Sequence, residues 1–255
     1  MTSTTMMAIA LAMFAGVIVC MEAGRRIAVW RRASGRAAEG TAALAGTLFA
    51  LLGLLIAFTF SGAASRFDDR RDLVVQEANA IGTAWLRLDV LPPDAQPSLR
   101  DLFRRYLDLR IAVYARLPDL EAAMAELGRA NELQGQIWSA AVRACQAASS
   151  PAVTTLILTS LNEMIDLTTT RTMAARLHPP ALIYWMLFLL LLVCSLFIGY
   201  EQADRPTRPL LHTIVYAVIM TIAIFVILNL EYPRLGLIGL DATDQVLVDL
   251  RKTMG

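Results

Sequence analysis

The feature that most restricts the fold is an uncharged, mostly apolar stretch that runs from Thr41 to Ser65. About 20 apolar residues in an α-helix, at a rise of ~1.5 Å per residue, are enough to cross the hydrocarbon core of a bilayer. The stretch exceeds that length without a single charged side chain. It is therefore predicted to be a membrane-spanning helix.

The residues that follow, from Arg66 to Leu91, keep a helical pattern but change in character. One side of this segment is charged, and the other is apolar at helical spacing through Leu73, Val74, Ala78, Ile81, Trp85 and Leu88. No proline interrupts either part. We therefore expect one nearly continuous helix that leaves the bilayer and continues in water, with Gly62 as the expected bend.

Composition places the whole chain among membrane proteins. Hydrophobic residues make up 56% of the sequence and charged residues only 18%, which lies outside the range of soluble globular domains. Further spans are predicted at Met1 to Met21, Pro180 to Tyr200 and Pro209 to Leu230. The first lacks the basic start and the small-residue cleavage site of a secretory signal, so we expect it to be retained.

The segment between the second and third spans is predicted to be helical throughout. It reads as four amphipathic helices separated by short breaks, each of which contains proline. The expected fold class is therefore all-α, with four transmembrane helices and a helical extramembrane bundle inserted between spans two and three. The expected layout is two spans with an arginine-rich connection in residues 1–64, the extramembrane domain in 65–178, two spans in 179–230, and a short amphipathic tail in 231–255.

The connection from Glu22 to Gly40 is rich in arginine. Guanidinium groups at this density are typical of the headgroup level, where they reach lipid phosphates, so we expect a loop or an interfacial helix there. Counted over short loops and flanks, arginine is nearly balanced between the two sides of the membrane, which leaves the orientation open. Taken alone, this first connection would place the helical domain outside.

No pattern of residues that supports catalysis is found in the sequence. Cys20, Cys145 and Cys194 are far apart, His178 precedes two prolines, and His212 has no acidic companion. There is also no phosphate-binding glycine loop and no Gly-x-Ser-x-Gly elbow. We therefore expect no enzyme activity, no catalytic residues, no cofactor and no metal site. The net charge of +1 argues against a nucleic-acid partner.

Two other groups of residues are candidates for a functional role. Gly46 and Gly53 lie seven residues apart on one helix face and are expected, with Gly62, to let another helix pack closely. A polar cluster late in the helical domain has two interpretations: it lines a water-filled vestibule, or it satisfies a buried helix junction, which the pattern favours. Its members are Asn162, Glu163, Asp166 and Arg171.

Several short motifs, taken together and in order, resemble an uncharacterised bacterial membrane family that is described as bestrophin-like. The resemblance covers about Gly40 to Met254. The residues that carry it are Ala57 to Ala63, Arg66 to Asp68, Arg70 and Arg71, Glu77 to Thr83, Arg87 to Asp89, Leu91 and Pro92, Leu161 to Asp166, and Pro233 with Gly236, Leu237 and Ile238.

The resemblance implies a pentamer of four-span subunits in the bacterial inner membrane, with the helical block in the cytosol. It implies that the second span lines a pore that conducts anions or, in some bacterial members, cations. By position, Leu55, Phe58 and Phe60 would form an apolar neck, which can gate by dewetting. The acidic calcium clasp of animal bestrophins is missing, since Pro233 is followed by Arg-Leu-Gly-Leu-Ile.

The sequence leaves two functional hypotheses of different classes. The first is an oligomeric channel for a small inorganic ion, embedded in the lipid bilayer as a homo-oligomer. The alternative is a membrane-anchored scaffold or sensor, with no transport activity, whose amphipathic helices bind a partner. An intramembrane enzyme is least favoured, because no acidic or basic side chain other than His212 is placed inside a predicted span.

Overall fold

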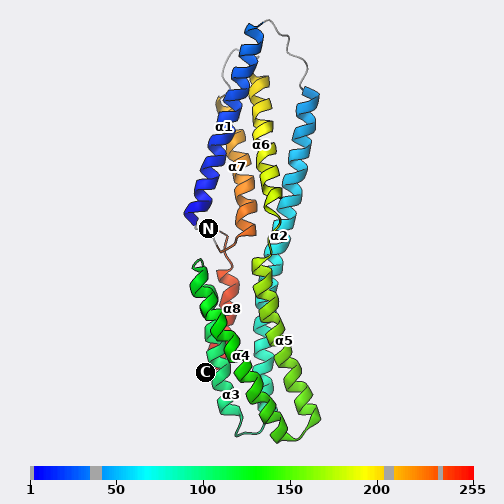
Figure 1. Ribbon diagram of the computed structural model, residues 1–255, viewed down its shortest axis with the longest axis vertical. Coiled ribbons are helices and arrows are strands. Elements are labelled where there is room, and N and C mark those ends of the chain that lie inside the picture. Colours follow the sequence, from blue (N-terminus) through cyan, green and yellow to red (C-terminus); the bar gives the residue numbers. More distant parts are fainter. Residues whose placement is uncertain (1–2, 35–41, 204–209, 235–237) are drawn as a thin grey trace. The chain divides into compact units, whose positions relative to one another are not determined.

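The computed structural model describes residues 3–34, 42–203, 210–234 and 238–255. Within these ranges the chain is helical and contains no strand, which confirms the all-α fold (Figure 1). The helices are α1 (Ser3–Ala33), α2 (Ala42–Arg87), the short 3-10 turn η1 (Leu88–Val90), α3 (Gln96–Ala115), α4 (Leu120–Ala148), α5 (Pro151–Arg176), α6 (Ala181–Gln202), α7 (Leu210–Glu231) and α8 (Asp241–Thr253).

The chain divides into two compact units. The membrane unit comprises Met1–Phe67 and His178–Ile238, and the bundle unit comprises Asp68–Leu177 and Gly239–Gly255. Among the described residues, four helical segments are long and apolar enough to cross a membrane, and their apolar parts are α1, the first half of α2, α6 and α7. This number agrees with the four predicted spans. Helix α2 contributes its first half to the membrane unit and its second half to the bundle unit.

The first helix is longer than the predicted span, which ended at Met21. Helix α1 continues through most of the arginine-rich connection to Ala33, so the loop alternative is wrong for residues 22–33. The helix continues because Glu22 accepts hydrogen bonds from Arg25 and Arg26, three and four residues ahead, each at 2.9 Å. The rest of the connection, residues 35–40, lies outside the described residues.

Two glycines bring α1 and α6 into backbone contact. A Cβ atom added at Gly24 would overlap the carbonyl oxygen of Leu196, and one added at Gly199 would overlap that of Met21. Such a small-residue crossing is how helices approach each other closely in lipid.

Replacing Gly199 by valine is expected to destabilise the membrane unit. The added side chain meets backbone rather than a flexible side-chain tip, so the helices must separate, at a cost of about 1–3 kcal/mol or more. Thermal unfolding of the detergent-purified protein measures the effect. Gly128→Val in α4 is the matched control, because no atom lies within 4 Å of a Cβ added there. Equal unfolding temperatures for the two variants would contradict the close crossing.

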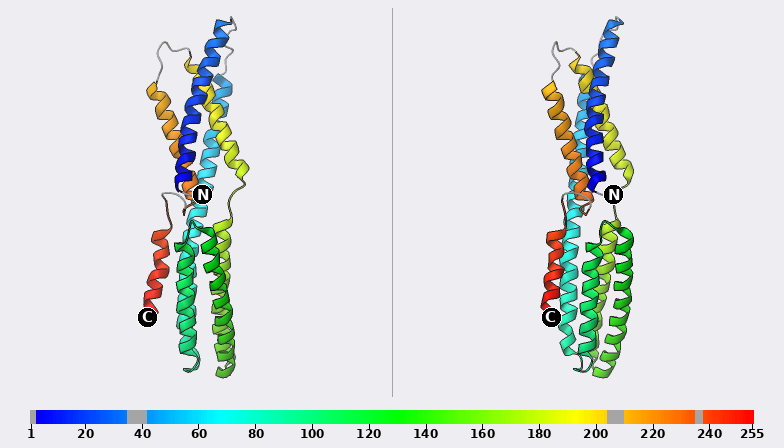
Figure 2. Two further views of the ribbon diagram at one scale, coloured as in Figure 1. Left: turned by 60° about the vertical axis from the view of Figure 1, so that its left-hand side comes forward. Right: turned by 90° about the vertical axis from the view of Figure 1, so that its left-hand side faces the viewer.

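The bundle unit is built around the second half of α2 with α3, α4 and α5. Helix α3 packs on α4, and α4 on α5, as Figure 2 shows. Of the six apolar positions predicted to share a face, five in α2 and Leu88 in η1, five are buried and Leu73 is partly buried. The predicted breaks are also present: the carboxylate of Asp119 caps α4, and the hydroxyl of Ser150 caps α5.

The C-terminal helix α8 belongs to the bundle unit and packs on α3. Leu247 is buried in the bundle core, and Arg251 donates a hydrogen bond of 2.8 Å to Asp108 of α3. This docking agrees with the amphipathic pattern of the tail.

Candidate functional site

The first half of α2 presents an exposed apolar face. In the span that α2 contributes, 11% of the residues are buried, the lowest share among the four candidate spans. Leu52 and Ala63 are buried in the membrane-unit core, and several partly buried α2 residues pack against it. Phe58 is 66% exposed and Phe60 46% exposed, whereas Leu55 is partly buried and packs against the core. The three neck candidates therefore differ in how far they are exposed.

The three glycines in the membrane-unit half of α2 do not pack against another helix of the described part of the chain. A Cβ added at Gly46 or Gly53 meets no atom within 4 Å, and one added at Gly62 meets only the Arg66 side chain of its own helix, at 3.2 Å. The packing role of Gly46 and Gly53 stays a prediction that requires another molecule. The two glycines that lie against the backbone of a neighbouring helix, Gly24 and Gly199, were not predicted to do so from the sequence.

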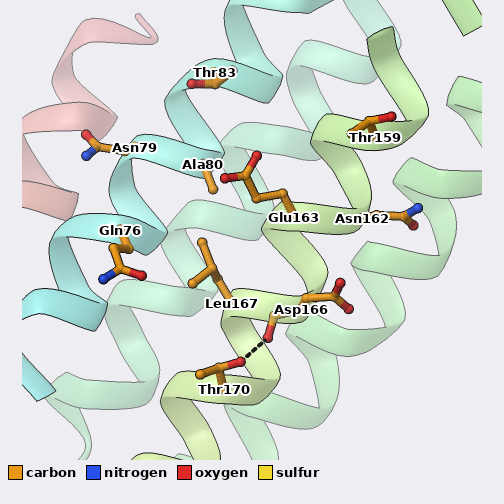
Figure 3. A pocket seen from close by; sticks show the side chains of 10 residues that line it. All are labelled: Gln76, Asn79, Ala80, Thr83, Thr159, Asn162, Glu163, Asp166, Leu167 and Thr170. Carbon is orange, nitrogen blue, oxygen red and sulfur yellow. Dashed lines mark hydrogen bonds between the residues drawn. The ribbon is translucent and has the colours of Figure 1, made fainter. Parts of the chain in front are cut away.

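A polar groove runs between α2 and α5 in the bundle unit (Figure 3). Three members of the predicted polar cluster line it, and all three are exposed rather than buried in a junction. In Figure 3, Glu163 extends towards α2. None of the ten lining residues is basic. They are Gln76, Asn79, Ala80, Thr83, Thr159, Asn162, Glu163, Asp166, Leu167 and Thr170.

Arg171, the fourth member of the predicted cluster, takes part in a separate, buried charge network. Glu77 of α2 accepts hydrogen bonds from Arg110 of α3, at 2.6 Å, and from Arg171 of α5. Arg171 also donates to Asp244 of α8, at 2.7 Å, and its guanidinium lies 3.6 Å from the centre of the Tyr114 ring. The network thus joins four helices of the bundle unit.

Burial and charge act against each other at Glu77, which lies in the polar half of α2 and is fully buried. Burial acts to raise the pKa of this carboxyl, but the charges and hydrogen bonds of Arg110 and Arg171 outweigh it and leave the pKa below its ordinary value. Glu77 is therefore ionised at neutral pH. No local pattern in the sequence indicates this network, because its bonded partners are 33 to 94 residues apart.

A second buried carboxylate, Glu231, ends α7 in the membrane unit. Arg66 of α2 donates to one of its oxygens at 2.8 Å, and His178 Nδ1 lies 2.8 Å from the other. The His178 ring also lies against that of Tyr232, with the centroids 4.5 Å apart. His178, for which the sequence analysis named no partner, therefore has a specific acidic one.

His212, the other histidine, is exposed near the start of α7. Within the described ranges, no group of three or more histidine, cysteine, aspartate or glutamate side chains is arranged to hold a metal ion. The described cysteines are all free thiols.

Comparison with known proteins relates nearly the whole chain to one family. A bestrophin-like domain matches residues 9–243. A crystal structure of a bacterial bestrophin homologue from Klebsiella pneumoniae, carrying a point mutation, superposes with a TM-score of 0.72 at 17% identity and covers 96% of this chain and 98% of its own. Another structure of a homologue from that organism gives 0.68 at 15% identity, with 95% and 98% covered. No curated protein matches at comparable significance.

The structural likeness at these identities establishes the fold, and the domain match over most of the length establishes the family. The four candidate spans and the all-α fold agree with this family and with this fold. The chain therefore belongs to the bestrophin-like family.

Proposed function

We propose that this protein is the subunit of a homo-oligomeric ion channel in the bacterial inner membrane, with α2 lining the pore. The observation that carries the proposal is the exposed apolar face of α2, in a chain that belongs to the bestrophin-like family. Family resemblance favours a pentamer, with an extramembrane domain over residues 65–178 on the cytosolic side.

The exposed face of α2 is suited to contact other copies of the chain. Gly46 and Gly53 lie in the helix interior, where glycine costs about 1 kcal/mol relative to alanine. No contact within the chain accounts for them, since a Cβ atom would fit at either position. Close approach of a neighbouring helix accounts for both. In such an assembly, Phe58 from each copy would surround the axis as an apolar constriction, which can gate by dewetting.

The groove between α2 and α5 supplies a wet, oxygen-rich surface on the same helix that lines the proposed pore. Its hydroxyl, amide and carboxylate groups suit a hydrated ion, and two carboxylates without a basic residue favour cations over anions. We therefore place this groove on the ion path, as the lining of a water-filled vestibule.

Planar-bilayer recording of the purified oligomer tests the proposal. Discrete, ion-selective currents are the expected result. A well-formed oligomer without conductance would contradict it, and a stoichiometric co-purifying partner in that case would support the membrane-anchored scaffold instead.

Neutralising the groove is expected to change ion selectivity. Glu163→Gln combined with Asp166→Asn removes both carboxylates and should lower the cation-to-anion permeability ratio severalfold, because the attractive potential for cations is lost. Reversal potentials in a salt gradient give this ratio. Glu121→Gln, which removes an exposed carboxylate of α4 outside the groove, should leave it unchanged. Equal permeability ratios in the wild type and both variants would contradict the proposal that the groove lies on the ion path.

A further inference from the structure

The chain passes between the two units at three places. The first lies in α2 after Phe67, the second between Leu177 and His178, and the third between Ile238 and Gly239. On the membrane-unit side, the residues at or near all three passages meet at one carboxylate, that of Glu231. Arg66 precedes the first passage, His178 follows the second, and Glu231 closes α7, the last helix before the third.

The geometry around Glu231 is specific. The carboxylate is fully buried, with Arg66 Nε and a terminal nitrogen of the same guanidinium 2.8 and 2.7 Å from Oε2, and His178 Nδ1 2.8 Å from Oε1. Burying an ionised carboxylate is costly unless it is paired and hydrogen-bonded on both oxygens, as it is here. Removing the charge of Glu231 would therefore release both partners at once.

Arg66 is part of the face by which α2 is anchored in the membrane unit. Leu52 and Ala63 are the two residues of that face that are fully buried in the membrane-unit core. Arg66 follows Ala63 by three residues and therefore lies on the same side of the helix. The pair between Arg66 and Glu231 joins this face of α2 to the end of α7. Phe58, on the exposed side, lies two turns earlier.

We propose that Glu231 is a positioning residue for the pore helix. Its carboxylate fixes the end of the membrane-spanning part of α2 to the α5–α6 connection and to the end of α7. Loosening this contact changes gating without preventing subunit assembly. The gating part of this inference rests on the proposed channel function, whereas the anchoring part does not.

Hydrogen exchange at fixed pH tests the anchoring. In Glu231→Gln, backbone amides in residues 60–67, 178–184 and 228–234 are expected to exchange about tenfold faster than in the wild type. Glu22→Gln is the matched control, since it also removes a carboxylate that binds two arginines in the membrane unit. It should leave these three segments unchanged. Unchanged exchange in Glu231→Gln would overturn the inference.

His178→Gln is a second variant, for the case in which Glu231→Gln does not fold. It removes the contact between His178 and Glu231 but keeps the ion pair between Arg66 and Glu231. Amide hydrogen exchange should therefore become faster in residues 178–184 but not in 60–67. Equal rises in both segments, or none in either, would contradict the assigned geometry.

Single-channel recordings then test gating. With oligomer size unchanged, Glu231→Gln is expected to alter open probability at least severalfold while Glu22→Gln does not. If the wild type conducts and Glu231→Gln gates identically despite faster exchange, the positioning role is wrong. If the wild-type oligomer does not conduct, the proposed channel function fails, and the exchange result alone decides whether Glu231 anchors α2.

Discussion

Glu77→Gln is expected to lower the unfolding free energy of the bundle unit by about 3–5 kcal/mol. The substitution leaves the fully buried guanidinium of Arg110 without a counter-charge, and it takes one of two carboxylate partners from Arg171. An uncompensated buried charge is among the largest single-site costs known for folded proteins. Chemical denaturation of the purified protein, followed by circular dichroism, measures it.

Two control variants separate the lost charge from other effects. Asp108→Asn breaks the exposed pair with Arg251 and should cost only about 0–1 kcal/mol. Glu77→Met combined with Arg110→Met replaces the buried pair by apolar side chains and should recover much of the loss. If Glu77→Gln were no more destabilising than Asp108→Asn, the network would not hold the bundle unit together.

The same network predicts an acid limit to stability. The pKa of Glu77 in the folded protein is below its ordinary value of about 4.3. Its contribution to stability is therefore fully present above that pH and is lost as the pH falls through the lower, folded-state pKa. Glu77→Gln, which has no carboxyl to titrate there, should lack this part of the acid destabilisation.

Gly53→Leu is expected to abolish assembly, the second large effect. In the isolated chain no neighbouring atom lies within 4 Å of a Cβ added at this position, so the fold should be kept. If α2 packs closely against α2 of a neighbouring copy, the same side chain forces the helices apart. Size-exclusion chromatography with light scattering should then show monomers that unfold at the wild-type temperature.

Phe58→Ala is the companion variant. It removes an exposed ring and should leave the oligomer intact, but it should widen the constriction and raise single-channel conductance. Wild-type currents from Phe58→Ala would count against the pore assignment, and a normal oligomer from Gly53→Leu would count against packing through this face.

The sequence predicts the helices of this protein well because each of them has a local signal. Uncharged stretches mark the spans, and the 3.6-residue period marks the bundle helices, which end at proline or at a polar cap such as Asp119. The end of α1 was misplaced because charged residues at Glu22 and beyond suggested a connection, whereas their pairing within one turn stabilises the helix.

The candidate site was predictable only in part, because tertiary contacts decide which polar residues belong together. Asn162, Glu163 and Asp166 were grouped with Arg171 on one helix, yet Arg171 faces the interior and bonds Glu77, 94 residues away. Glu231, the partner of His178, is also far from it in the sequence, so no local pattern links the two. Whether another copy covers Gly46 and Gly53 depends on contacts that a single chain does not contain.

Cysteine accessibility along α2 tests most directly whether this helix lines an ion-conducting pore. Phe58→Cys would be made after replacing Cys20, Cys145 and Cys194 by alanine. The control is Leu189→Cys, made in the same way at a position of α6 that is as exposed as Phe58 of α2. A charged, water-soluble thiol reagent added during recording should block the current of the Phe58→Cys channel and leave that of Leu189→Cys unchanged. Current through the Phe58→Cys channel that the reagent does not affect would contradict the account.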